Sequence, residues 1–170
     1  MLTLGSDWTG KRVLDVGCGL GHLLEYVREQ GIEIASYTGL DLSPEMIKEC
    51  KSHFEGRSDV GFLEGDFMTY PFVLRYDVVA ASGLLSHRIE NDAHPLKTIQ
   101  EKMAMLYDLC EDVAAMNFLS TYTSHAEKDE ITFQYFHPLD ILKIALDITP
   151  YVELKQSYLP NDFTVLLFKR

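Results

Sequence analysis

Cysteine and basic residues are scarce in this 170-residue chain. Its three cysteines, Cys18, Cys50 and Cys110, lie far apart and form no short Cys-x-x-Cys or Cys/His ligand pattern. This spacing argues against a disulfide framework and against a zinc site, and it is typical of reduced thiols in a cytoplasmic protein. We therefore expect no bound metal and a cytoplasmic location.

Positive charge is also in short supply, with 15 basic against 26 acidic residues and a formal net charge of -11. Such a surface repels a phosphate backbone, and no cluster of Lys and Arg is longer than a pair. Apolar runs stay well below the ~18 residues of a membrane span, and the first residues do not resemble a signal peptide. We expect neither nucleic acid nor a membrane as a partner.

The remaining composition is that of an ordinary globular protein, with 46% hydrophobic and 24% charged residues. At this length the chain has room for one substantial core, so we expect a single domain over residues 1–170. Strand-like apolar runs alternate with helical patterns along most of the chain. Strands are expected at 11–17, 32–40, 60–63, 76–81, 113–119, 152–158 and 163–168, and the principal helices follow Leu20, Ser43, Pro95 and Phe136.

The stretch from Val13 to Leu23 is the most informative, because an apolar strand there breaks into three alternate glycines and then into a helical pattern. Glycine is favoured where φ is positive or where a ligand approaches the main chain. The helix that follows presents unpaired amides and the positive end of its dipole to such a ligand. A dinucleotide-binding fingerprint requires a glycine at the sixth position, and counting from Gly17 that position is His22.

The pattern of Asp15, Gly17, Gly19 and Gly21 resembles the first motif of the class I S-adenosylmethionine-dependent methyltransferases. The run from Gly39 to Ile47 is similar to the second motif of that family. The resemblance implies a doubly wound α/β fold, a Rossmann-like methyltransferase fold with a seven-stranded, mostly parallel sheet. Its strand order is 3-2-1-4-5-7-6, with strand 7 antiparallel.

The resemblance also implies which residues hold S-adenosylmethionine. Asp15 would orient the glycine loop and the methionine amino group, and Asp41 would hold the ribose hydroxyls. Asp66 would bind the adenine amine. The other residues expected at the donor are Gly17, Cys18, Gly19 and Gly21 beneath it, Leu42 and Phe67 around the adenine ring, and Ser82 at the end of the fourth strand.

His87 is the candidate general base or acceptor-orienting group, because imidazole titrates near ~6.5. Ordinary structural roles compete with these assignments: a turn acid for Asp66, core packing for Phe67 and a surface position for His87. Further candidate contacts to the acceptor are Tyr122, His125, Tyr135 and His137.

The sequence thus predicts an S-adenosylmethionine-dependent methyltransferase that acts by in-line transfer to oxygen or nitrogen of a small-molecule acceptor. Two alternatives stay open: a module that binds the donor without turnover, and a nicotinamide-dependent oxidoreductase. About ten residues precede Lys11, so we expect the family's N-terminal helix to be short or absent. An apolar face left uncovered there would favour a homodimer.

Overall fold

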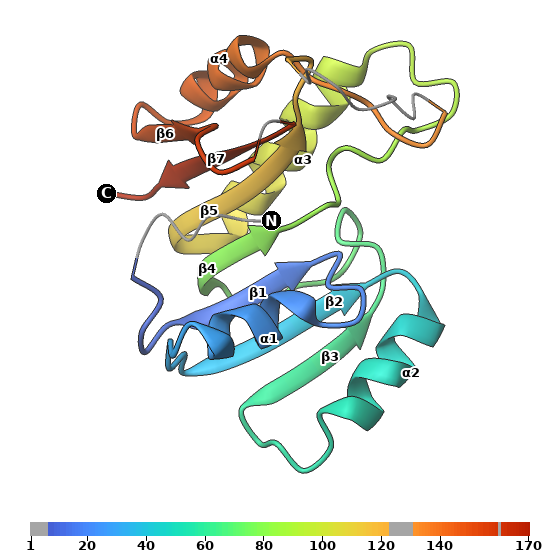
Figure 1. The fold of residues 1–170 in the computed structure, drawn as a ribbon, viewed down its shortest axis with the longest axis vertical. Helices are drawn as coiled ribbons and strands as arrows, with labels where there is room; N and C mark the ends of the chain where they lie inside the picture. Colours follow the sequence, from blue (N-terminus) through green and yellow to red (C-terminus); the bar gives the residue numbers. More distant parts are fainter. Residues whose placement is uncertain (1–6, 123–130, 160) are drawn as a thin grey trace.

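The computed structural model describes residues 7–122, 131–159 and 161–170 and contains a seven-stranded sheet flanked by helices (Figure 1). The strands are β1 (Arg12–Val16), β2 (Ser36–Asp41), β3 (Val60–Glu64), β4 (Tyr76–Ala81), β5 (Cys110–Leu119), β6 (Val152–Lys155) and β7 (Asp162–Phe168). The helices are α1 (His22–Glu29), α2 (Pro44–His53), α3 (Pro95–Leu109) and α4 (Pro138–Ile148).

The order of the strands is β3-β2-β1-β4-β5-β7-β6, as the sequence predicted. The pairs among β1 to β5 are parallel, whereas β7 runs antiparallel to β5 and to β6. A parallel pair needs a crossover connection, and the helices between the strands supply most of these connections. The expected doubly wound fold is confirmed.

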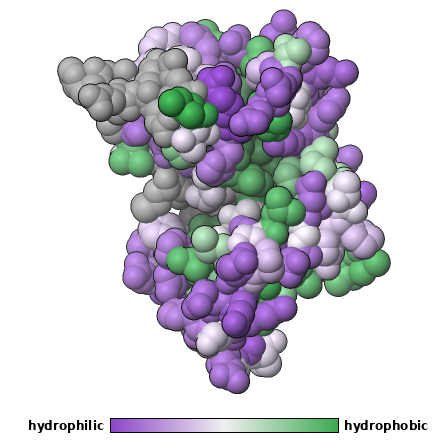
Figure 2. All heavy atoms as spheres, turned by 90° about the vertical axis from the view of Figure 1, so that its right-hand side faces the viewer, coloured by the Kyte–Doolittle hydropathy of each residue, from purple (hydrophilic) through white to green (hydrophobic). Residues whose placement is uncertain are grey.

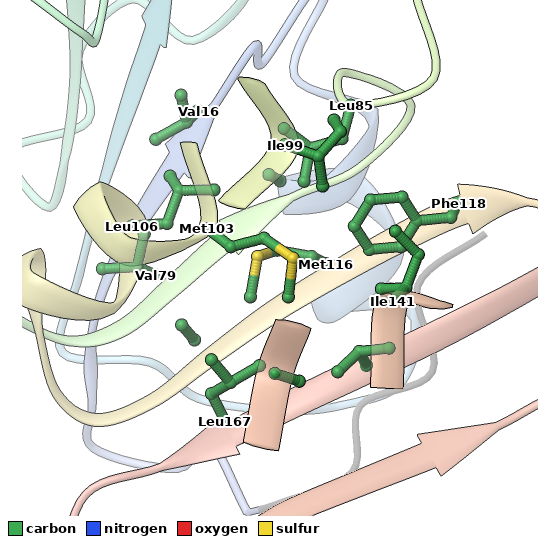
Figure 3. Packing of buried hydrophobic residues seen from close by; sticks show 14 of the residues in the cluster. Val16, Val79, Leu85, Ile99, Met103, Leu106, Met116, Phe118, Ile141 and Leu167 are labelled. Carbon is green, nitrogen blue, oxygen red and sulfur yellow. The ribbon is translucent and has the colours of Figure 1, made fainter. Parts of the chain in front are cut away.

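Buried side chains alternate between the two faces of the sheet, since successive residues of a strand point to opposite sides. In β1, Val13 packs with the cluster of α1 and α2, whereas Leu14 packs with the cluster of α3 and α4. Figure 3 shows the second cluster, where Met103 of α3 lies beside Met116 of β5. The sheet is therefore buried on both faces, as parallel sheets usually are.

The helix signals in the sequence correspond to observed helix ends. The Ser43 hydroxyl accepts a hydrogen bond from the Met46 amide at 3.3 Å, and Pro44 occupies the first turn of α2. In α3, Ile99, Met103 and Leu106 recur at helical spacing and are buried. In α2 the buried residues are Ile47 and Cys50, and Met46 beside them is 39% exposed.

Several strand bounds differ from the predicted ones. β5 begins at Cys110, directly after α3, rather than at Val113. β2 begins at Ser36 rather than Ile32, and β6 ends at Lys155 rather than Tyr158. No helix occurs within residues 65–75 between β3 and β4, where Pro71 disfavours a helix.

The arrangement opens a crevice at the carboxyl ends of the strands. α1 leaves β1 on one face of the sheet and α3 follows β4 on the other, and these two strands are neighbours. Ligands of doubly wound sheets bind outside such a switch point. Figure 2 views this edge of the sheet and shows a hollow across its middle in which hydrophobic residues are visible.

The described residues ahead of β1, 7–11, form no helix. Trp8 among them is fully buried against the cluster of α1 and α2. Among the described residues, no helix is long and apolar enough to cross a membrane.

Candidate functional site

The turn between β1 and α1 carries three glycines with positive φ angles: 72° at Gly17, 52° at Gly19 and 81° at Gly21. A Cβ added at Gly17 would lie 3.0 Å from Leu84 Cδ1, and one at Gly21 would lie 2.9 Å from Phe54 Cε2. At Gly19 an added Cβ would meet no atom within 4 Å. The turn is therefore packed from below at two glycines and open to a ligand at the third.

Asp15 lies at the base of this turn and is buried, with 2% of its surface exposed. Its Oδ2 accepts a hydrogen bond from the Tyr37 hydroxyl at 2.6 Å, whereas its Oδ1 has no partner among the described residues. Burial raises the pKa of Asp15 to about 7, against a lowering by the Tyr37 hydrogen bond. A buried carboxylate oxygen without a partner is costly, so the site is suited to a donor that comes from outside the chain.

Asp41, the last residue of β2, links two segments of the site. Its Oδ2 accepts from the Gly19 amide at 2.8 Å, and its Oδ1 accepts from the Ser43 amide at 2.9 Å. Each carboxylate oxygen has a second lone pair, so the group retains acceptor capacity toward a hydroxyl. It thus fixes the glycine turn while remaining available at the crevice.

Two buried thiols hold the turn from behind. Cys50 Sγ donates to the Gly19 carbonyl at 3.1 Å, and Cys18 Sγ lies 3.8 Å from the same oxygen. Burial raises the pKa of both thiols, which keeps them protonated and weakly nucleophilic. Their role here is structural.

Two adjoining cavities lie on this turn. The first, which we call the loop cavity, has a volume of about 370 Å³ and includes the expected residues Asp15, Gly17, Cys18, Gly19 and Ser82. The second, the β2–β3 cavity, has about 430 Å³ and includes Gly17, Asp41, Leu42, Asp66 and Phe67. Gly17 lines both, so the two volumes meet at the first glycine of the turn. Together they bring nine of the predicted donor residues to one crevice.

Two predicted residues lie elsewhere. Gly21 is not among the residues that line either cavity; it precedes α1 and packs against Phe54. His87 is exposed and lines a third space of about 290 Å³, the α3 cavity, together with Asp92, Thr98 and Lys102. Burial lowers the pKa of the Lys102 ammonium there.

A short wall, formed by the paired residues 86–88 and 132–134, separates the α3 cavity from a fourth cavity. The Arg88 amide donates to the Thr132 carbonyl at 2.9 Å and the Gln134 amide to the Ser86 carbonyl at 2.8 Å, and His87 pairs with Phe133 in an antiparallel bridge. The rings of the paired residues His87 and Phe133 lie on the same side, with their centroids 5.2 Å apart, so both rings contribute to the boundary between the two cavities. His87 and Gln134 line the α3 cavity, whereas Ser86, Phe133 and Tyr135 line a cavity of about 470 Å³ near β7, the β7 cavity.

The residues suggested for the acceptor are distributed over this region. Tyr135 lines the β7 cavity. His137 precedes α4, where its Nδ1 accepts from the Leu139 amide at 3.2 Å and its Nε2 lies 2.8 Å from the Tyr122 hydroxyl. Accepting at Nδ1 leaves Nε2 as the protonated nitrogen of neutral His137. His125 lies outside the described residues.

Comparison with known proteins decides the family. Residues 13–106 match the family model described as a methyltransferase domain. The chain belongs to this family. The predicted place among the class I S-adenosylmethionine-dependent methyltransferases is confirmed, and the enzyme class is that of a methyltransferase.

Relatives of this methyltransferase include "Putative methyltransferase Rv1506c" of Mycobacterium tuberculosis, which is 30% identical over 158 residues, 91% of each chain. The ubiquinone biosynthesis O-methyltransferase of Erwinia tasmaniensis is 35% identical over 81 residues, 46% of this chain and 32% of that enzyme. The chain thus spans about a third of the latter protein's length in the match.

Solved structures share the fold of this methyltransferase at low identity. Magnesium protoporphyrin IX methyltransferase from Synechocystis PCC 6803, crystallised with bound SAH, has a TM-score of 0.71 and 17% identity, and the match covers 96% of this chain and 76% of that one. Human N-acetylserotonin methyltransferase in complex with SAM has a TM-score of 0.71 and 16% identity, with 96% and 49% covered.

Three residues that bound these cavities or hold their lining residues were not predicted from the sequence. Tyr37 holds Asp15, and Asn117 and Asp162 line the β7 cavity. Asn117 follows the buried apolar run 113–116 of β5, and a polar residue after such a run is the signal that would have marked it; Asp162 is the first residue of β7. In the part of the chain that the structure describes, no group of three or more His, Cys, Asp or Glu side chains could hold a metal ion.

Proposed function

We propose that this methyltransferase binds S-adenosylmethionine across the loop and β2–β3 cavities and transfers the methyl group directly to an oxygen or nitrogen atom of a small-molecule acceptor. The observation that carries the proposal is the buried Asp15, which is among the residues lining the loop cavity and whose Oδ1 has no hydrogen-bond partner within residues 7–122, 131–159 and 161–170. An ammonium group satisfies such an oxygen with a charge-assisted hydrogen bond. The α-amino group of a methionine moiety is a ligand of this kind.

The chain also offers groups that match the ribose and the adenine of the donor. Asp41 would accept from the ribose hydroxyls at the end of β2. Asp66, which is exposed and lines the β2–β3 cavity, would accept from the adenine amine. Leu42, 71% exposed, and Phe67 at the cavity would flank the ring with apolar surface. A cavity of about 430 Å³ lies within the usual ~300 to 1,000 Å³ range of small-molecule sites.

S-adenosylmethionine supplies an electrophilic methyl group on its sulfonium sulfur. The contribution of the chain is then to hold donor and acceptor in line and to exclude water, and orientation alone is worth ~7 to 11 kcal/mol. The fixed glycine turn, tied down by Asp41 and Cys50, provides a rigid floor for this task. The role expected for His87 in proton transfer stays a prediction, since this residue lines the α3 cavity.

Asp41→Asn tests the donor site. The amide side chain can accept from only one of the two backbone amides that Asp41 holds, Gly19 and Ser43, and it removes the charge that would hold the ribose. The binding free energy for S-adenosylmethionine should therefore weaken by about 1.5 to 3 kcal/mol, roughly 10- to 150-fold in affinity. Isothermal titration calorimetry measures the change. Glu49→Gln on the exposed side of α2 is the matched control. An Asp41→Asn protein with wild-type affinity would contradict the assignment.

A further inference from the structure

The α3 cavity adjoins the proposed donor site. Ile89 and Lys102 line both the α3 cavity and the β2–β3 cavity, so the two cavities are neighbours. Leu85 lines the α3 cavity, and the residue before it, Leu84, lines the β2–β3 cavity beside Gly17. A molecule that enters the α3 cavity therefore lies next to the space assigned to the donor.

Lys102 of α3 is a partly buried cation at the junction of these two cavities. Within residues 7–122, 131–159 and 161–170, its ammonium forms no ion pair and no side-chain hydrogen bond. Burial lowers the pKa of Lys102 more than the charges of Asp66 and Asp92 raise it. A cation that has lost part of its hydration is stabilised by a negative partner, and the described part of the chain places none in contact with it.

The two carboxylates that act on Lys102 are each held by their own turn. Asp66 Oδ1 accepts from the Met68 amide at 3.0 Å, and Asp92 Oδ1 accepts from the His94 amide at 2.8 Å. The hydrogen bond from the His94 amide lowers the pKa of Asp92, which keeps this carboxylate ionised at the start of α3. Because local hydrogen bonds fix both groups, neither is available as a contact partner for Lys102.

Arg88 adds a second cation to the α3 cavity. Its amide donates to the Thr132 carbonyl at 2.9 Å, which fixes the backbone, whereas its guanidinium forms no ion pair with the residues that the structure describes. Glu90 is exposed at the same cavity and pairs with neither Arg88 nor Lys102. Guanidinium and ammonium groups both bind carboxylates through charge-assisted hydrogen bonds.

Apolar side chains form the inner wall of the α3 cavity. Leu85, Ile99 and Phe136 line it and are buried. Its volume of about 290 Å³ is at the lower limit of the usual ~300 to 1,000 Å³ range, which suits one end of a small molecule. Gly17 is not among its lining residues, so this end of the molecule lies apart from the glycine turn.

Resting on the proposed function, we propose that the α3 cavity binds a carboxylate group of the methyl acceptor, with Lys102 as its main partner and Arg88 as the second. The acceptor is then a small organic acid whose apolar body packs on the inner wall and whose methylated atom lies toward Gly17. The bound carboxylate is an anchor and not the nucleophile, because hydrogen bonds from two cations stabilise its charged form and lower its basicity. Lys102 thus determines which charge the acceptor carries.

Three probes with the same phenyl body and different charge test this inference: 3-phenylpropanoate, its neutral amide 3-phenylpropanamide, and 3-phenylpropylamine. Their binding to wild-type protein saturated with S-adenosylhomocysteine is measured by calorimetry and ligand-observed NMR. We expect 3-phenylpropanoate to bind about tenfold or more tightly than the amide, and the amine to bind most weakly. Tighter binding of the amide or the amine, or no binding of any probe, would overturn the proposal on the unmodified protein.

Variants then locate the anion site. Lys102→Met keeps the apolar stem and removes the charge, so it should abolish the preference for 3-phenylpropanoate over the amide, and Arg88→Met should reduce this preference. Lys97→Met is the matched control, since Lys97 is on the same helix, pairs with Glu101 and does not line the cavity. An unchanged preference in Lys102→Met, or an equal loss in Lys97→Met, would contradict a carboxylate site at Lys102.

The donor is assayed separately, because Lys102 also lines the β2–β3 cavity. If Lys102→Met weakens binding of S-adenosylhomocysteine but keeps the preference for 3-phenylpropanoate, Lys102 serves the donor and the inference is overturned. If wild-type protein does not bind S-adenosylhomocysteine, the proposed function fails. The same probe series on protein without S-adenosylhomocysteine then still decides whether Lys102 binds a carboxylate.

Discussion

Asp15 shows, at the scale of one residue, how a site is maintained at the expense of stability. Its pKa rises from the ordinary 3.8 to about 7 because the carboxylate is buried. Between these values the folded protein binds the proton more tightly than the unfolded chain, so the free energy of unfolding falls as the pH rises. Well above pH 7 the free energy of unfolding no longer falls, and the total loss amounts to about 4 kcal/mol for a pKa shift of this size.

Asp15→Asn should remove this dependence. The advantage of the variant over the wild type in free energy of unfolding is expected to grow by about 2 to 3 kcal/mol from pH 5 to pH 8, because only the wild type has a carboxylate to ionise. Denaturant unfolding at both pH values measures it, with Asp147→Asn on the surface as control. The same variant should bind S-adenosylmethionine poorly. An equal difference between variant and wild type at pH 5 and pH 8 would contradict the ionisation of Asp15.

The sequence alone pointed to Asp15 and Asp41 but not to the residues that surround them. The acid two residues before Gly17 and the acid at the end of β2 are local patterns, and local patterns are legible in a sequence. The Tyr37 hydroxyl that holds Asp15 comes from a neighbouring strand, 22 residues away. The unpaired oxygen is the outcome of three-dimensional packing, and no spacing in the sequence reports it.

At the scale of elements, the β1–α1 unit depends on Gly21 for two separate reasons. Its φ of 81° lies in the left-handed region, and a Cβ there would approach Phe54 Cε2 to 2.9 Å. Phe54 stacks on Phe62 at 5.5 Å between ring centroids, so it has little freedom to move. Gly31, just beyond α1, has a φ of 70° but no atom within 4 Å of an added Cβ.

Comparing Gly21→Ala with Gly31→Ala separates the two effects. Both substitutions should cost about 1 to 2 kcal/mol of backbone strain, and Gly21→Ala should cost about 1 to 3 kcal/mol more through overpacking against Phe54. Chemical denaturation measures both free energies of unfolding. If the two variants lose equal stability, Phe54 does not constrain the turn.

Most helices and strands could be predicted from the sequence, whereas the pairing of segments far apart in the chain could not. Ser43 marked the start of α2, and Pro95 marked the start of α3. The wall beside the β7 cavity was missed because backbone bonds between Ser86 and Gln134, 48 positions apart, create it. Such a pairing leaves no local pattern in either segment.

The whole molecule places its ligand crevice where β1 and β4 meet, so a ligand there touches both halves of the sheet. The loop and β2–β3 cavities draw residues from β1, β2 and α1 and from the segments that follow β3 and β4. A nicotinamide dinucleotide needs a third glycine where this chain has His22, an exposed residue at the start of α1. The crevice should therefore distinguish an adenosyl amino acid from a dinucleotide.

Thermal unfolding with added ligand tests this distinction on the intact protein. A ligand that binds only the folded state at 100 times its dissociation constant stabilises by about 2.7 kcal/mol, which for a domain of this size raises Tm by roughly 5 to 11 °C. S-adenosylhomocysteine should produce a shift of this order, and Asp41→Asn should reduce it at equal ligand concentration. NAD at the same concentration should produce none, because the helix start at His22 lacks the close approach that a pyrophosphate requires. A shift with NAD and none with S-adenosylhomocysteine would instead favour an oxidoreductase built on the same sheet.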